Sequence, residues 1–72
     1  MPKFPSLKSK EVARALEKAE FIFVRQNGSH KIFIKEKICI TIPWHNKDMK
    51  IGTVKSIIKQ SGLTVQEFLE FL

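Results

Sequence analysis

Residues 21–43 read FIFVRQNGSHKIFIKEKICITIP, and this stretch decides the fold. Its segments are rich in Ile, Phe and Val, and two short polar breaks, Asn27-Gly28 and Glu36-Lys37, divide them. Such runs are typical of strands, and Asn-Gly is a strong hairpin signal because both residues tolerate positive φ. We therefore predict a meander of three antiparallel strands over residues 21–26, 29–35 and 38–42, and Pro43 ends the third.

A helical pattern precedes the strands. Val12, Ala13, Leu16 and Ala19 recur at intervals of three and four, which predicts a helix with one core-facing stripe. Ser6 or Ser9 is placed to cap its start, because a serine hydroxyl accepts a hydrogen bond from the first free backbone N–H groups.

Two more helices are predicted after a polar loop over residues 44–50. In the first of them Thr53 is expected to be the cap, and Gly62 stands where a left-handed residue ends a helix. Thr64 and Glu67 then form the capping box of a short last helix.

This order of elements predicts an α+β fold. Both longer helices need a surface on which to bury an apolar stripe, and one face of the sheet is the only one available. The arrangement, α-β-β-β-α with a three-stranded antiparallel sheet and a short C-terminal helix, is similar to the double-stranded-RNA-binding domain (dsRBD). The other face of the sheet is expected to stay free for a partner, although a fold alone does not assign a function.

The length and charge of the chain limit the classes of function that it can have. The chain has 72 residues, and we expect a single domain over residues 1–72. Its net charge is +6, and seven lysines lie between Lys31 and Lys59, whereas the last nine residues carry Glu67 and Glu70 and no base. A basic region of this kind favours a polyanion partner, most commonly nucleic acid. The alternative is a lysine surface that serves only solvation.

The remaining composition indicates no cofactor. Cys39 cannot form an internal disulfide, and within a strand it is expected to behave as a small apolar residue. His30, Cys39 and His45 lack the paired spacing of a zinc site, so no metal is expected. The first six residues lack the apolar core of a signal peptide, and no run is long enough to span a membrane, so we expect a cytoplasmic protein.

His30 is the residue that carries chemistry. It stands where the polar turn enters the second predicted strand, so the strand ladder is expected to hold its ring. Histidine can both accept and donate a proton near neutral pH. Ser29 and Lys31 flank it, and Arg25 is expected across the hairpin, so the neighbourhood is basic and favours phosphodiester chemistry. With regular pairing, Lys31 is expected on the opposite face of the strand from His30. The alternative is an ordinary hydrogen-bonded strand histidine, which is the more common case.

Four blocks of sequence carry a specific likeness. They are Gly28-Ser29-His30 with Ile32-Phe33, then Ile42-Pro43-Trp44-His45, then residues 52–64, and then Glu67-Phe68-Leu69. In this order and spacing the chain resembles the HicA family of mRNA interferase toxins over nearly its whole length. One departure is Glu20, where the family often has glycine.

The resemblance implies a small metal-independent ribonuclease that cleaves mRNA and arrests growth. It also implies neutralisation by a HicB-type antitoxin that covers the active site, and it makes His30 the catalytic residue. Membrane and direct DNA partners are not expected. The RNA-binding candidates are Ser29, Lys31, Arg25, Lys55 and Lys59.

Several alternatives stay open at this point. The same fold and charge would suit a non-catalytic module that binds double-stranded RNA, or an inactive toxin kept for partner binding. His45 is either the second acid–base group or a loop histidine that fixes the turn. Trp44 is either a stacking platform for an unpaired base or a cap on the open end of the core.

Overall fold

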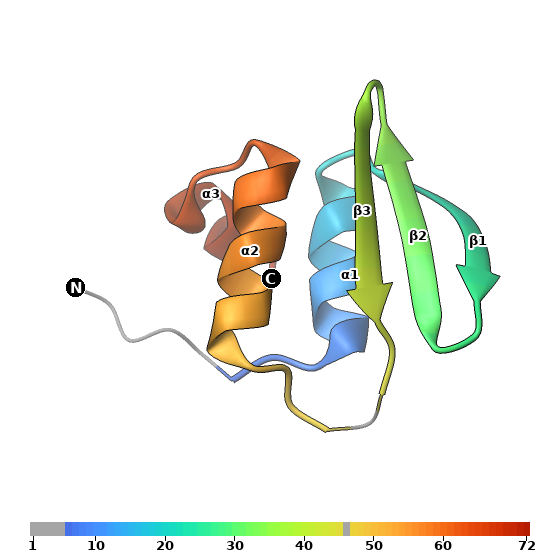
Figure 1. Cartoon of the computed structure of the whole chain (residues 1–72). Helices are drawn as coiled ribbons and strands as arrows, with labels where there is room; N and C mark the ends of the chain where they lie inside the picture. The colour runs from blue at the N-terminus through green and yellow to red at the C-terminus, as the bar shows by residue number, and fades with distance from the viewer. Residues whose placement is uncertain (1–5, 46) are drawn as a thin grey trace.

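Three antiparallel strands in the order β1-β2-β3 form the sheet of the computed structural model, which describes residues 6–45 and 47–72. Helices α1 and α2 pack on one side of this sheet, and α3 packs against these two helices (Figure 1). The predicted α+β, dsRBD-like order is confirmed. The elements are α1 (Ser9–Lys18), β1 (Ile22–Asn27), β2 (His30–Lys35), β3 (Ile38–Pro43), α2 (Ile51–Ser61) and α3 (Val65–Glu70).

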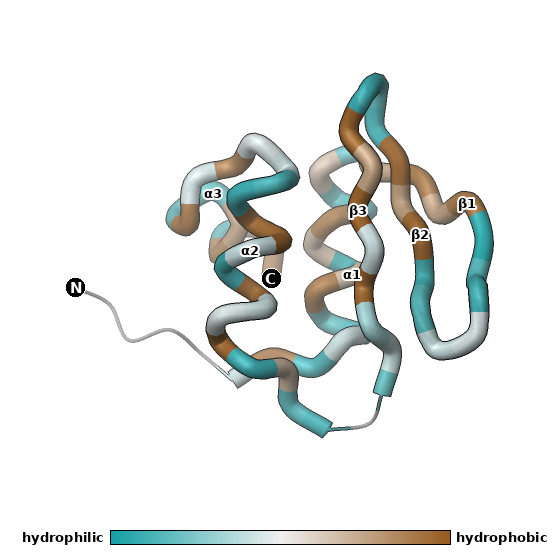
Figure 2. Tube along the Cα trace, viewed as in Figure 1, coloured by the Kyte–Doolittle hydropathy of each residue, from teal (hydrophilic) through white to brown (hydrophobic). Residues whose placement is uncertain are grey.

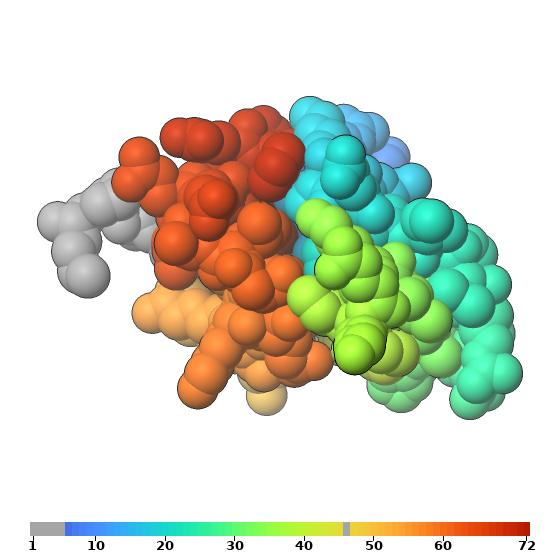
Figure 3. All heavy atoms as spheres, turned by 90° about the horizontal axis from the view of Figure 1, so that it is seen from above, coloured from blue at the N-terminus to red at the C-terminus, as the bar shows by residue number. Residues whose placement is uncertain are grey.

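The core lies between the sheet and the helices. From the sheet, Phe33, Ile40 and Ile42 are at most 2% exposed and face the helices. The predicted stripes of α1 and α2 meet them, and Phe68 of α3 is fully buried behind these helices. Viewed from the end that holds the Glu36–Lys37 turn, the side chains of α2 and of the strands meet directly (Figure 3). One face of the sheet is therefore covered, and the other is open.

The β1–β2 turn differs from the prediction. Asn27 pairs with His30, so the two loop residues are Gly28 and Ser29 and not Asn27 and Gly28. Only the first loop residue needs positive φ here, and Gly28 supplies it at 62°. A bulge between Phe23 and Arg25 shifts the register further along the strand.

The starts of the two long helices also differ from the prediction. Lys8, not Ser6 or Ser9, is the N-cap of α1, and Lys50, not Thr53, is the N-cap of α2. Ser9 is buried because its hydroxyl donates to the Pro43 carbonyl, 2.7 Å away, which removes it from local capping. A tertiary contact that the local sequence does not show has replaced the cap.

The other helix boundaries follow the prediction. Gly62 ends α2 in the left-handed region, with φ of 81°. Thr64 Oγ1 accepts from the Glu67 N–H at 3.1 Å, and Glu67 Oε1 accepts from the Thr64 N–H at 2.9 Å. The backbone and side-chain hydrogen bonds with Thr64 lower the pKa of Glu67 below its ordinary value.

Glu20 explains how α1 ends without a glycine. Its φ is 74°, and the N–H groups of Glu20 and Phe21 donate to the carbonyls of Glu17 and Leu16, which is the Schellman pattern. Lys35 Nζ donates to the Ala19 carbonyl at 2.9 Å and supports the same helix end. The departure from the family pattern thus leaves the helix end in place, but with a non-glycine residue in a strained conformation.

Glu20→Gly is expected to stabilise the protein by about 0.5–1 kcal/mol, because glycine adopts this φ without a steric penalty. For a domain of this size, the melting temperature should rise by about 2–8 °C in a thermal unfolding experiment. Glu20→Ala is the control: it removes the carboxylate but keeps Cβ, so no comparable rise is expected. An equal rise in the melting temperature of both variants would assign the stabilisation to removal of the Glu20 carboxylate charge and not to the backbone conformation.

Candidate functional site

One end of the molecule gathers positive charge. The β1–β2 hairpin, the end of β3, the loop after it and the starts of α1 and α2 all lie at this end (Figure 1). Along β1 and β2 the residues nearest this end are hydrophilic, and apolar residues follow farther from it (Figure 2). We call it the basic end. The basic residues of this end are Lys8, Lys10, Arg25, Lys31, Lys47 and Lys50, and one acidic residue, Asp48, lies among them.

His30 is the first residue of β2, the central strand. It is exposed, and it pairs with Asn27 of β1 on one side and with Pro43 of β3 on the other. The strand start predicted for it is confirmed. Because backbone pairing continues on both sides, the Cα–Cβ direction is fixed while the imidazole stays accessible to a ligand.

The side chain of His30 lies on the open face of the sheet. Side chains alternate along β2, so Phe33 points to the helices and Ile32 and Ile34 share the open face with His30. Arg25 pairs with Ile32 and therefore lies on this face, across the hairpin as predicted and diagonal to His30. Such a diagonal spans about 7–8 Å between Cα atoms, which long side chains bridge.

Lys31 lies on the other face, as predicted. Its Nζ is 3.7 Å from the centroid of the Trp44 ring and 5.7 Å from that of Phe23. Ser29 sits beside it in the turn, where its carbonyl accepts a hydrogen bond from the Trp44 N–H. Ser29, His30, Lys31 and Arg25 are thus brought to one hairpin, whereas Lys55 and Lys59 lie on the exposed side of α2.

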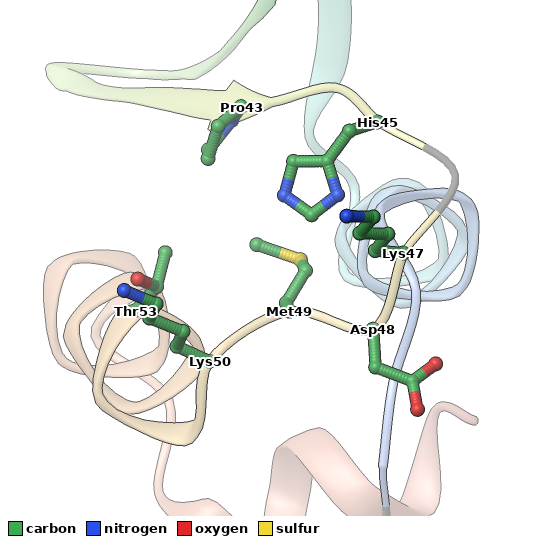
Figure 4. A pocket seen from close by; sticks show the side chains of 7 residues that line it. All are labelled: Pro43, His45, Lys47, Asp48, Met49, Lys50 and Thr53. Atoms are coloured by element: carbon green, nitrogen blue, oxygen red, sulfur yellow. The ribbon is translucent and has the colours of Figure 1, made fainter.

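His45 has a different setting from His30. Its ring points into a hollow of about 270 Å³ between the end of β3 and the start of α2 (Figure 4). Its backbone N–H lies 3.5 Å from Ser9 Oγ. Pro43, Lys47, Asp48, Met49, Lys50 and Thr53 also line this hollow.

Lys8 and Lys10 are the site residues that sequence reasoning missed. Together with Trp44 and His45 they line a second hollow of about 310 Å³. They reach it because Ser9, between them, is bonded to Pro43, and because Lys8 forms a backbone bridge with Asp48. No sequence spacing signals this, since the partners are 34 or more residues apart.

Within residues 6–45 and 47–72, no group of three or more His, Cys, Asp and Glu side chains could hold a metal ion. None of the helices in that part of the chain is long and apolar enough to cross a membrane. Cys39 is exposed on the open face of the sheet. The signal-peptide prediction concerns residues 1–6, of which residues 1–5 lie outside the described part.

A comparison with protein families matches residues 9–63 to the HicA toxin of bacterial toxin–antitoxin systems. The chain belongs to the HicA toxin family. The match runs from the start of α1 through the whole sheet and α2, and so includes the hairpin with His30. Membership implies a toxin with a cognate antitoxin. No curated protein gives a significant match.

Ser9→Ala tests the contact that assembles this end. The variant leaves the Pro43 carbonyl without its buried donor, so the free energy of unfolding should fall by about 1–3 kcal/mol, as measured by denaturant unfolding. Ser6→Ala is the matched control, because Ser6 is exposed and caps no helix; a change under about 0.5 kcal/mol is expected. Equal losses in both variants would contradict the assigned role of Ser9.

Proposed function

We propose that this HicA-family toxin is a metal-independent endoribonuclease that cleaves mRNA, with His30 as a general acid–base catalyst. The observation that carries the proposal is the placement of His30. Its imidazole stands exposed at the head of the central strand, within the end of the molecule where basic side chains gather. A proton-transfer group among cations suits a reaction in which charge develops on phosphoryl oxygens.

The reaction proceeds without a cofactor. A general base removes the proton of the ribose 2′-hydroxyl, the 2′-oxygen bonds to phosphorus, and the bond from phosphorus to the 5′-oxygen breaks. A general acid gives a proton to the departing 5′-oxygen. The products are a 2′,3′-cyclic phosphate and a 5′-hydroxyl, and His30 serves as either base or acid.

The surroundings of His30 supply charge. Arg25 shares its face and is within reach of a phosphate bound there, and Lys31 and Ser29 border the same hairpin. The start of α2 adds partial positive charge, since it has a lysine at the N-cap, no side-chain cap and no acidic residue in its first turn. Lys55 and Lys59 extend the basic surface along α2 and are assigned to flanking phosphates.

The main competing function is a non-catalytic module that binds double-stranded RNA. The dsRBD-like order of elements and the net charge of +6 favour it as much as they favour a ribonuclease. The two differ in what His30 does: a module that only binds should lose little when this side chain is removed.

His30→Ala should lower the rate of RNA cleavage by about 10²–10⁴-fold while the protein stays folded and still binds RNA, because only the proton transfer is lost. The measurement is cleavage of a purified mRNA, with the product ends identified as cyclic phosphate and 5′-hydroxyl. The wild-type pH–rate profile should show a limb that the variant lacks.

Cys39→Ala is the matched control, an exposed residue on the same face that pairs with Ile34, at the opposite end of β2 from His30. It should cleave at close to the wild-type rate. Equal cleavage by wild type and His30→Ala would remove His30 from the mechanism. Tight RNA binding without cleavage by the wild type would favour the binding module.

We further propose that the cognate antitoxin is of the HicB type and covers His30 by docking on the open face of the sheet. Ile22, Val24 and Ile34 are 69%, 49% and 36% exposed, and all three line one shallow hollow on this face. Adjacent apolar side chains of this kind mark partner surfaces. A partner seated on them would extend toward His30 along the same face.

Ile22→Lys should weaken the complex with the antitoxin by about tenfold or more, because it places a charge in the apolar contact. Binding is measured by calorimetry with the two purified proteins. Val65→Lys is the control, since Val65 is a similarly exposed apolar residue on α3, away from the sheet. Unchanged affinity in Ile22→Lys would place the antitoxin elsewhere.

A further inference from the structure

Trp44 occupies a position that neither a core role nor the proposed catalysis accounts for. It is half-buried and packs against the core, which fixes the ring, but it also lines the hollow that holds Lys8, Lys10 and His45. The backbone N–H of Trp44 donates to the Ser29 carbonyl, so Trp44 extends the β2–β3 ladder by one more hydrogen bond. Closing the core does not require a tryptophan to border an open hollow that two lysines also line.

Cations surround this ring. Lys31 Nζ is 3.7 Å from the ring centroid, close enough for a cation–π contact, and Lys8 and Lys10 share the hollow with the indole. A rigid aromatic surface among lysines has the features of a single-strand nucleic-acid site, in which a base stacks on the ring and phosphates meet the cations.

We propose that Trp44 is a stacking platform for an unpaired RNA base, with Lys8 and Lys10 binding the adjoining phosphates and Lys31 holding the other side of the ring. This inference rests on the proposed function and adds its substrate class: the protein acts on single-stranded RNA. A base inside a duplex is already stacked on both sides and has no face to offer the indole.

The topology supports a single strand as well. Trp44 and Lys31 lie on the helix side of the sheet, whereas His30 lies on the open side, and the ladder connects them through Ser29 and Pro43. An RNA that contacts both sites must pass around the end of the hairpin. A flexible single strand can bend in this way over one or two nucleotides, and a stiff duplex cannot.

The chain reports on this site directly, because Trp44 is its one tryptophan and it contains no tyrosine. The experiment is a fluorescence titration of the His30→Ala protein with a 2′-O-methyl RNA oligonucleotide, which lacks the 2′-hydroxyl nucleophile. Saturable quenching by the single strand, and at least tenfold weaker quenching by a duplex of the same sequence, is the expected result.

Variants separate stacking from other changes. Trp44→Leu keeps an apolar side chain for the core but has no ring, so it should lower the affinity for the same oligonucleotide by about fivefold or more, measured by anisotropy of a labelled strand. Trp44→Phe keeps a ring and should retain most of the affinity. Thermal unfolding of both variants shows whether the fold is intact.

Failure of this inference and failure of the proposed function give different results. Cleavage of RNA by the wild type, with no quenching at saturation or with equal affinity in Trp44→Leu, overturns the platform and leaves the ribonuclease. Quenching by single strands without cleavage leaves the platform and removes the catalysis. Equal quenching by single strand and duplex overturns the assignment to single-stranded RNA.

Discussion

The buried hydrogen bond from Ser9 Oγ to the Pro43 carbonyl is the contact on which the arrangement of the basic end depends. It joins the first residue of α1 to the last residue of β3, 34 positions apart. Pro43 is also the partner of His30 in the ladder, so one hydroxyl holds the helix start against the strand pair that positions the histidine. Together with the backbone bridge between Lys8 and Asp48, this bond places Lys8 and Lys10 beside Trp44.

The two ends of the molecule are stabilised in different ways. At the far end, each helix terminus has its own partners: a Schellman motif after α1, Gly62 after α2 and a reciprocal capping box at α3. At the basic end, lysines stand at both N-caps, where serine or aspartate would give a more stable helix start. The first turn of α1 has Glu11, whose carboxylate accepts from the Lys8 N–H at 3.1 Å, whereas the first turn of α2 has no acidic residue.

A sequence prediction succeeded where the interacting residues are close in the sequence, and it failed where they are far apart. Local patterns sufficed for the order of elements, for Gly62 and for the capping box, because each depends on residues within a few positions. They failed for the helix starts, because Ser9 takes its partner from β3. They failed for the hairpin, because a glycine in the first loop position suits a turn that leaves Asn27 in the strand. With this turn Arg25 pairs with Ile32, so it lies diagonally from His30.

Contacts between residues on different elements could not be derived from the sequence. Lys31 was placed on the correct face by alternation alone, but its contact with Trp44 joins two strands and could not be derived. His30 and Trp44 lie on opposite sides of the hairpin end. The proposed antitoxin surface and the proposed RNA-stacking surface are therefore on different faces of the sheet. An antitoxin on the open face would cover His30 and leave the indole and its lysines uncovered. The antitoxin would then block cleavage without blocking the contact between Trp44 and RNA. The inhibited complex would keep a single-strand binding surface.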